Sequence, residues 1–384
     1  MSQSKLRVMS IFGTRPEAIK MAPLLLELDR RPEIESIPCL TAQHREMLDG
    51  VMTRFGLTAP YDLDIMEPGQ TLYTVTAKAL TGLGKVLADA KPDCVLVHGD
   101  TTTTFSAALA AFYAKIPVGH VEAGLRSGDN LSPFPEEMNR KLTGQIAALH
   151  FAPTAKNAEN LRQEGITEGV FVTGNTVIDT MRYTLDYFPG RFGNELDQID
   201  WANRRVITLT CHRRENYGAP MQAIFQAVKA LVERHPDVEL VYPVHPSPAV
   251  QEAARTILGN TARMHLIAPL DTVQMHALLN KSYLVLTDSG GLQEEAPALG
   301  RPVLVLRRET ERPEAITAGT VKLAGVDYDE ILRLGELLLT DQNTYKNMAK
   351  AVNPYGDGEA SARIADAILW HFGRRTEPPA EFNP

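Results

Sequence analysis

The sequence predicts an α/β fold with two domains, each built on a parallel sheet. Short apolar runs alternate along the chain with amphipathic stretches, which is the pattern of successive βαβ units. The 384 residues exceed what one ordinary core supports, and the apolar share of 44% is enough for two cores. Polar motifs follow many of the apolar runs, and parallel sheets place ligand sites at the carboxyl ends of their strands.

Eight apolar runs are expected to form buried strands: 6–13, 94–100, 118–124, 170–175, 205–212, 238–245, 283–290 and 302–307. Helical patterns lie at 103–114, 135–149, 219–234, 272–281 and 360–372. Thr14 and Glu17 stand at the spacing of a capping box, with Pro16 early in the helix that they begin. The strand–helix series pauses near 187–201, so a linker or hinge near 170–200 would divide two similar halves.

Charge and composition exclude several classes of function. The net charge is −8 and there is no basic block, which disfavours nucleic acid and membrane surfaces as partners. The N-terminal segment has no signal-like apolar core, and no apolar run approaches the roughly 20 residues of a membrane span. Cys39, Cys94 and Cys211 are scattered, which disfavours a disulfide framework or a zinc ribbon. We therefore expect a cytoplasmic protein.

Carboxylates follow two predicted strands in the first half of the chain. Asp100 ends "HGD", Glu122 lies in "GHVEAG", and Glu136 and Glu137 open a helical run. Converging on one site, Asp100, Glu122 and Glu136 would form a general acid/base set. The plainer alternative is surface capping, with an ion pair between Glu136 and Arg140, four residues further on the same helix face.

Two strand-to-helix junctions are suited to phosphate. In "GTRPEAIK" (13–20), Gly13 permits close backbone approach and Arg15 offers a bidentate donor. In "SGGLQEEA" (289–296), two glycines precede a helix whose Glu295 is able to accept ribose hydroxyls. The alternatives are a capped helix with a surface arginine, and acids that complement the helix dipole. Neither stretch is a Walker or GxGxxG motif, which disfavours a P-loop enzyme or a dehydrogenase.

The stretch "LTCHRRENYG" (209–218) admits three interpretations. Cys211 and His212 would form a nucleophile–base pair or a metal site, or His212 would join the arginines to hold an anion. Neighbours on a strand point to opposite faces, which argues against a Cys–His pair. His98, His120 and His245 follow other strands, but nothing has zinc spacing. We therefore expect Cys211 to be a small packing residue, with His212 and Arg213 facing an anion.

Taken together, the motifs resemble those of the bacterial non-hydrolysing UDP-N-acetylglucosamine 2-epimerases, in the family order and over nearly the whole chain. They are "FGTRPEAIKMAPL", "TAQHREMLD", "VHGDTTTT", "GHVEAGLRSGD", "PEEMNR", "TGNTVID", "HRREN", "YPVH", "TDSGGLQEEAPALG", "ERPEAITAGT" and "NPYGDG".

The resemblance implies a glycosyltransferase-B-like fold, in which two Rossmann-like domains with parallel sheets face a cleft. The domains would be 1–170 and 171–359, with a C-terminal helix at about 360–374 packing back on the first. It implies a homodimer that interconverts UDP-GlcNAc and UDP-ManNAc by eliminating UDP to a 2-acetamidoglucal and adding it back. No cofactor or metal takes part, and the product supplies ManNAc units for cell-surface polysaccharide.

The resemblance also assigns residues. The catalytic set is Asp100, Glu122, Glu136 and His212. The nucleotide contacts are Arg15, Ser289, Gly290, Gly291, Glu295 and Arg312, and a second, activating UDP-GlcNAc would contact Gln43, His44, Arg213 and His245. A UDP-sugar glycosyltransferase, a hydrolysing epimerase and a nucleotide-sugar sensor are the alternatives. An acceptor-dependent rate, release of free ManNAc, or binding without turnover would identify them.

Overall fold

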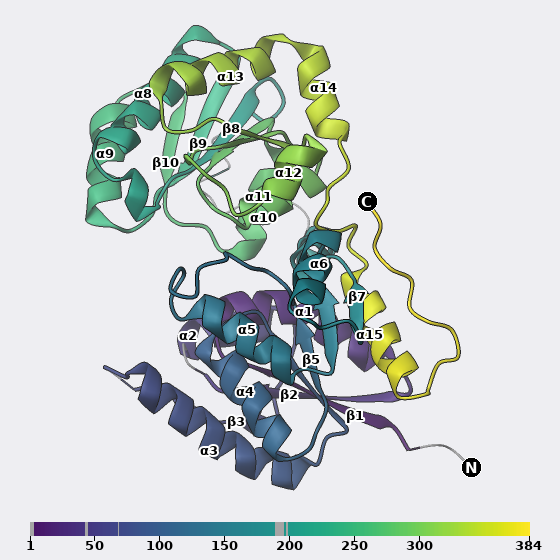
Figure 1. The fold of residues 1–384 in the computed structure, drawn as a ribbon. Coiled ribbons are helices and arrows are strands. Elements are labelled where there is room, and N and C mark those ends of the chain that lie inside the picture. Colours follow the sequence, from purple (N-terminus) through teal and green to yellow (C-terminus); the bar gives the residue numbers. More distant parts are fainter. Residues whose placement is uncertain (1–3, 43–44, 68, 189–195, 197–198) are drawn as a thin grey trace. The chain divides into compact units, whose positions relative to one another are not determined.

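The computed structural model describes residues 4–42, 45–67, 69–188, 196 and 199–384. The chain forms two compact units, one comprising the chain up to Thr180 together with Tyr355–Asn383, the other comprising Met181–Pro354. Each unit is a sheet with helices packed on it (Figure 1). Within the described part of the chain, no helix combines the length and apolar character that a membrane crossing requires.

The first unit contains a parallel sheet in the order β3-β2-β1-β4-β5-β6-β7. The strands described there are β1 (Leu6–Phe12), β2 (Ile34–Leu40), β3 (Tyr61–Asp62), β4 (Cys94–His98), β5 (Val118–Val121), β6 (Leu149–Ala152) and β7 (Val170–Val172). The helices are α1 (Arg15–Arg30), α2 (Arg45–Arg54), α3 (Leu72–Ala90), α4 (Thr102–Tyr113), α5 (Glu136–Ile146), α6 (Ala155–Gln163) and α15 (Ala360–His371), with α7 (Thr176–Tyr187) running into the second unit.

The second unit contains a parallel sheet in the order β10-β9-β8-β11-β12-β13. Its described strands are β8 (Arg205–Thr210), β9 (Val238–Pro243), β10 (Met264–Ile267), β11 (Leu284–Thr287), β12 (Val303–Val305) and β13 (Val321–Leu323). The helices are α8 (Ala219–Arg234), α9 (Pro248–Leu258), α10 (Thr272–Lys281), α11 (Leu292–Ala298), α12 (Pro313–Ala318), α13 (Tyr328–Thr340) and α14 (Gln342–Lys350), with a 3₁₀ turn at Arg214–Asn216.

Both sheets are covered by apolar helix faces, as the continuous apolar strands predicted. In the first unit α3 and α4 pack over β1 and β4, and α15 packs on α1, where Arg31 Nη1 lies 3.2 Å from Asp366 Oδ1. In the second unit α8, α9 and α13 enclose one core cluster. The predicted α/β class with two parallel sheets is therefore confirmed.

The strand orders determine where a ligand site is expected. The connection changes direction between β1 and β4 in the first sheet and between β8 and β11 in the second. Open α/β sheets bind ligands at the carboxyl ends of the strands beside such a switch point. The residues after these four strands include Arg15, Asp100, His212 and Ser289, which the sequence had already marked as candidates.

Candidate functional site

The junction between β1 and α1 is held together by one buried carboxylate. The predicted capping box of Thr14 and Glu17 is present. Glu17 Oε2 accepts from Gly13 N at 3.0 Å and Thr14 N at 2.7 Å. Its Oε1 accepts from the hydroxyls of Thr101 at 2.7 Å and Thr104 at 3.1 Å, just after β4. Glu17 therefore joins the two segments at the switch point, with half-buried Arg15 opening the helix beside it.

Glu122 lies just beyond β5 and faces two basic groups. Lys20 Nζ forms an ion pair with Oε2, and His98 Nε2 lies 3.1 Å from the same oxygen. Burial alone would raise the pKa of Glu122, but the Lys20 ammonium and His98 outweigh it and hold that pKa well below its ordinary value. The backbone of Glu122 is left-handed, with φ of 62°. This conformation is uncommon for a non-glycine residue and occurs at helix ends and turns, as at Lys91, as well as at functional sites.

Asp100 is oriented by Arg140. Its Oδ2 accepts from Arg140 Nε at 2.9 Å, and Nη2 lies 2.7 Å from the same oxygen. Arg140 Nη1 donates to Glu137 Oε2 at 3.0 Å. The alternative of an ion pair between Arg140 and Glu136 at helical spacing is therefore not found, because Glu137 and Asp100 take the guanidinium. Burial opposes ionisation of Glu137, but backbone N–H groups and Arg140 hold its pKa below the ordinary value.

Glu136 differs from its neighbour. It begins α5, and its buried Oε2 has no hydrogen-bond partner among the described residues. Asp100 and Glu122 follow the adjacent, paired strands β4 and β5, and α5 supplies the arginine that holds Asp100. The structure thus brings the three predicted acids onto neighbouring elements at one edge of the first sheet. Two are ion-paired and one keeps a buried oxygen unbonded, as proton transfer to a ligand would require.

Cys211 is a packing residue, as predicted. It is 1% exposed and belongs to the core cluster of the second unit. Burial, then the charge of Asp288, raises the pKa of the thiol well above its ordinary value. A thiol in this state is no nucleophile. Its carbonyl accepts from the buried Tyr242 hydroxyl at 2.8 Å, which anchors the end of β8.

His212 and Arg213 are positioned by Asp288, a fully buried carboxylate after β11. Oδ2 accepts from His212 N and Arg213 N, both at 2.8 Å, and from Asn216 Nδ2 at 3.1 Å. Oδ1 lies 3.2 Å from His212 Nδ1, an electrostatic contact without hydrogen-bond alignment. Burial lowers the pKa of His212, Asp288 opposes this, and His245 and Arg213 add to it. The imidazole is therefore mainly neutral at pH 7 with Nε2 available.

Two guanidinium groups converge over the glycines after β11. Nη2 of Arg213 and Nη2 of Arg312 each lie 4.0 Å from where a Cβ on Gly290 would stand. Arg213 Nε is buried without a hydrogen-bond partner among the residues the structure describes. Arg312 is held by an ion pair with Glu294, which is 3% exposed. Two cations beside a glycine backbone form a place for an anion.

Glu295 points to a different group. Its Oε2 lies 3.3 Å from Nε2 of the buried His276, whose Nδ1 is 2.6 Å from Thr184 Oγ1. A Cβ on Gly291 would stand 3.1 Å from Glu295 Oε1, so the carboxylate lies directly over that glycine. Ser289 N donates to Thr287 Oγ1 at 2.9 Å, which fixes the first residue of the turn.

The predicted activator residues are only partly described. The His245 ring stacks on the His212 ring, with centroids 5.4 Å apart and planes 13° apart. His245 Nδ1 accepts from Ser247 N at 3.2 Å. Arg213 belongs to the cation pair over Gly290. Gln43 and His44 lie outside the described residues.

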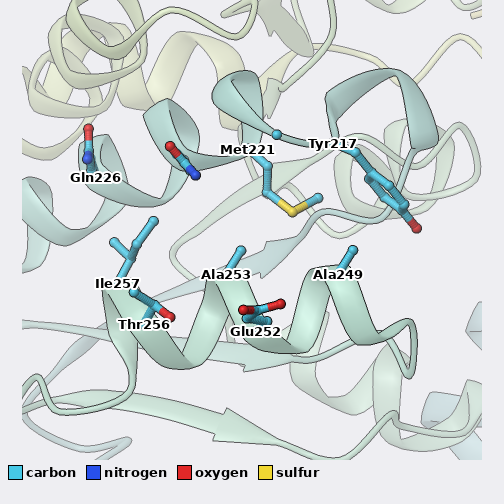
Figure 2. A pocket seen from close by; sticks show the side chains of 10 residues that line it. Tyr217, Met221, Gln226, Ala249, Glu252, Ala253, Thr256 and Ile257 are labelled. Carbon is cyan, nitrogen blue, oxygen red and sulfur yellow. The ribbon is translucent and has the colours of Figure 1, made fainter.

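A groove of about 580 Å³ between α8 and α9 is separate from these residues. Figure 2 shows Ala249, Glu252 and Ala253 of α9 facing Tyr217 and Met221 across it. Its charged lining residue is an acid and no lining residue is basic. The groove is therefore unsuited to phosphate.

Sequence reasoning missed four residues that organise the site: Lys20, Asp288, Glu294 and His276. Asp288 stands in "TDSGG" directly after a strand, as Asp100 does in "HGD", so position alone could have found it. Lys20 lies within the quoted "GTRPEAIK". Nothing in the sequence distinguishes Glu294 from Glu295 or marks His276, because their partners come from distant segments.

The comparisons with known proteins agree on one family. The family model for UDP-N-acetylglucosamine 2-epimerase matches residues 26–369. The UDP-N-acetylglucosamine 2-epimerase of Bacillus subtilis is 54% identical over 379 residues, covering 98% of this chain and 99% of that protein. A putative UDP-N-acetylglucosamine 2-epimerase structure from Listeria monocytogenes has a TM-score of 0.94 at 51% identity, covering 99% of this chain and 100% of that one.

A UDP-GlcNAc 2-epimerase from Neisseria meningitidis, solved bound to UDP-GlcNAc, has a TM-score of 0.85 at 47% identity and covers 95% of this chain and 100% of that one. The glycosyltransferase-B-like fold that the sequence predicted is therefore shown. With a family model matching most of the chain and a full-length relative at 54% identity, this protein belongs to the UDP-N-acetylglucosamine 2-epimerase family.

Proposed function

We propose that the protein reversibly epimerises UDP-N-acetylglucosamine at C2 to give UDP-N-acetylmannosamine. The proposal rests on one observation: the two switch points have different kinds of functional group. The first has the carboxylates Asp100, Glu122 and Glu136, and the second has His212 with the Arg213 and Arg312 cations. Carboxylates are suited to moving a proton at carbon, and cations with a histidine are suited to a departing phosphate.

The reaction requires both sets of groups. The proton on C2 is not adjacent to a carbonyl, so simple enolate formation is not available. Removing that proton while UDP leaves C1 gives a 2-acetamidoglucal and UDP. UDP then returns to C1 while a proton is delivered to the other face of C2. Both halves of this cycle need an acid–base pair at C2 and stabilised charge on the phosphate.

The surroundings of each acid indicate which role in proton transfer it is suited to. Glu122 stays ionised at neutral pH because Lys20 and His98 hold its pKa low, which is the state that a proton acceptor needs. Glu136 has a buried oxygen without a partner among the described residues, which leaves that oxygen able to exchange a proton. Asp100 is held by Arg140 and would orient or receive the sugar.

The nucleotide is assigned to the second switch point. We propose that Ser289, Gly290, Gly291 and Arg312 contact UDP there, with His212 at the leaving phosphate. Arg15, which opens α1 at the first switch point, is proposed as a further nucleotide contact. Glu295, which lies over Gly291, would take the ribose hydroxyls. A second UDP-GlcNAc would act as activator and contact Gln43, His44, Arg213 and His245. The stack of the His245 ring on the His212 ring supports a link between this activator position and the leaving phosphate.

Turnover in deuterated water tests the proposal. Purified protein is incubated with UDP-GlcNAc, and the nucleotide sugars are followed by NMR. UDP-ManNAc carrying deuterium at C2 is expected. Absence of UDP-ManNAc would refute the activity, and UDP-ManNAc with protium at C2 would refute the elimination route. Free ManNAc and UDP as the main products would identify a hydrolysing enzyme.

We also propose a homodimer that acts in the cytoplasm and supplies ManNAc units for cell-surface polysaccharide. Tyr73, Phe112 and Tyr113 are 87%, 59% and 66% exposed on α3 and α4, which pack side by side. Large exposed apolar side chains on neighbouring helices support association of two copies. Light scattering coupled to size exclusion measures the assembly, and a monomeric mass at working concentration would contradict it.

A further inference from the structure

The turn that carries Asp100 is held by side chains at each of its backbone carbonyls. This Asp100 turn comprises residues His98–Asp100, at the end of β4. The first carbonyl accepts from Thr104 Oγ1 at 2.6 Å and the second lies 2.7 Å from His120 Nε2. The third accepts from Asn139 Nδ2 at 2.9 Å. The three side chains belong to α4, β5 and α5, so three separate elements fix one short segment.

All three side chains are buried, and the bond of His120 fixes the state of its ring. A carbonyl oxygen only accepts, so His120 Nε2 must carry the proton and donate it to Gly99 O. Its Nδ1 is then bare, and it has no hydrogen-bond partner within the described chain. The side chain is 1% exposed, and burial lowers its pKa to about 3. The ring therefore stays a neutral donor over the whole range in which the protein would work.

The chain bends sharply at the centre of this turn, at a glycine. Gly99 has φ of 68°, in the left-handed region, and the chain reverses there before α4 begins. Gly99 N donates to Val121 O at 2.9 Å, and His120 adds a second link to the same strand from the carbonyl of the same residue. Arg140 orients the Asp100 carboxylate. The backbone that carries this carboxylate is held instead by Thr104, His120 and Asn139.

We propose that Thr104, His120 and Asn139 are positioning residues that hold the Asp100 turn in its reactive geometry, with His120 as the central clamp. The inference rests on the proposed function, since Asp100 is taken as one of its catalytic carboxylates. None of the three side chains needs to touch the substrate. They act by keeping the Asp100 carboxylate within the small tolerance that proton chemistry allows, because a displacement of about 1 Å can cost roughly 100-fold in rate.

His120→Met removes the donor and keeps an apolar side chain of similar size. We expect kcat to fall by about 10- to 100-fold with KM for UDP-GlcNAc within about twofold. His120→Gln keeps an N–H donor and should recover part of the loss. His150→Met is the matched control, because His150 is 2% exposed and lies opposite His120 in the register on β6, one strand further from the turn. It should retain the wild-type kcat.

A double-mutant cycle separates positioning from general damage. If His120 acts through Asp100, then His120→Met should slow the Asp100→Asn enzyme far less than it slows the wild type. Equal slowing in both backgrounds would overturn the inference. Asn139→Ala breaks the third link and should give the same non-additive pattern, which keeps the test valid if His120→Met does not fold.

Hydrogen exchange measures the clamp without any turnover. The amide of Gly99 should exchange faster in His120→Met than in wild type or His150→Met, since its bond to Val121 loses the neighbouring link. If the Gly99 amide exchanged at the same rate in His120→Met and in the wild type, the clamp would be refuted even in an active enzyme. Faster Gly99 exchange in His120→Met than in the wild type, together with a wild type that makes no UDP-ManNAc, would leave the clamp standing and refute the proposed function.

Discussion

Changing Asp288 tests whether its carboxylate orients His212 for the reaction or only stabilises the fold of the second unit. It is fully buried, and Oδ2 accepts from His212 N and Arg213 N at 2.8 Å and from Asn216 Nδ2 at 3.1 Å. Alanine would leave three donors without this acceptor, one buried and two partly buried, at up to about 1–3 kcal/mol each. The sum of about 3–9 kcal/mol is comparable to the whole stability of a domain, about 5–15 kcal/mol. Asp288→Asn is therefore the informative change.

Asparagine keeps an oxygen for the three donors and removes the charge. Hydrogen bonds to charged groups exceed neutral ones by about 1 kcal/mol, so three bonds lose about 3 kcal/mol, offset in part by easier burial of the amide. The amide nitrogen would face His212 Nδ1, and the imidazole would lose the carboxylate charge 3.2 Å away that favours the tautomer with a proton on Nδ1. The wrong tautomer costs about 10⁴ in kcat in a serine-protease triad. Because His212 is 36% exposed and the contact is 3.2 Å, we expect a smaller loss, about 10²–10³.

The assay is the initial rate of UDP-ManNAc formation, with urea unfolding measured on the same preparations. Thr208→Val is the matched control, since it breaks a buried hydrogen bond of 2.6 Å between Thr208 on β8 and Ser282 at the end of α10, away from the loop after β8. It should lose comparable stability and keep its rate. A folded Asp288→Asn enzyme with more than about half of the wild-type kcat would refute the assigned role, since tautomer control predicts a loss of orders of magnitude.

Three further changes follow from individual contacts. Lys20→Met removes the cation that lowers the pKa of Glu122, so burial should raise that pKa. The acid limb of the kcat/KM profile should then move to higher pH. An acid limb that does not move would show that Glu122 does not set it. Cys211→Ala should keep at least about half of the activity and cost about 1–2 kcal/mol in thermal unfolding, since the thiol only packs; an inactive but folded variant would restore the nucleophile hypothesis. A Cβ at Gly13 would lie 1.9 Å from Thr41 Oγ1, so Gly13→Ala should lower the free energy of unfolding by about 1–3 kcal/mol. The double variant Gly13→Ala/Thr41→Ala should regain much of this loss. Equal unfolding midpoints for the single and double variants would place the strain elsewhere.

The fold was predictable where apolar residues form continuous runs. All eight predicted strands are present, each ending earlier than its apolar run suggested. The strands β2, β3, β6, β10 and β13 were missed. β2 contains Pro38, which argues against an inner strand. Yet β3 pairs only with Cys39 and Leu40, so Pro38 has a strand on one side alone and no second ladder to interrupt. Short strands such as β3 depend on pairing that a local pattern does not encode.

The candidate site was predictable to the extent that its groups stand directly after strands. Asp100, His212 and Gly290 follow β4, β8 and β11, and the strand orders place all three strands beside switch points. Partners were not predictable, because they come from segments far apart in the chain. Arg140 illustrates this: helical spacing pairs it with Glu136, but the structure gives it to Glu137 and Asp100.

Hydrogen-bond partners divide the acids of this chain into two groups that sequence position does not distinguish. Glu17, Glu137 and Asp288 accept from backbone N–H groups, and each keeps a turn closed. Because these turns use the carboxylates as acceptors, we expect these three acids to take no part in proton transfer. Glu122 instead faces side-chain cations, and Glu136 has a buried oxygen with no partner in the described chain. An oxygen that accepts no hydrogen bond is the more accessible to a proton, and this favours Glu136 over its neighbour Glu137 as a participant in the reaction.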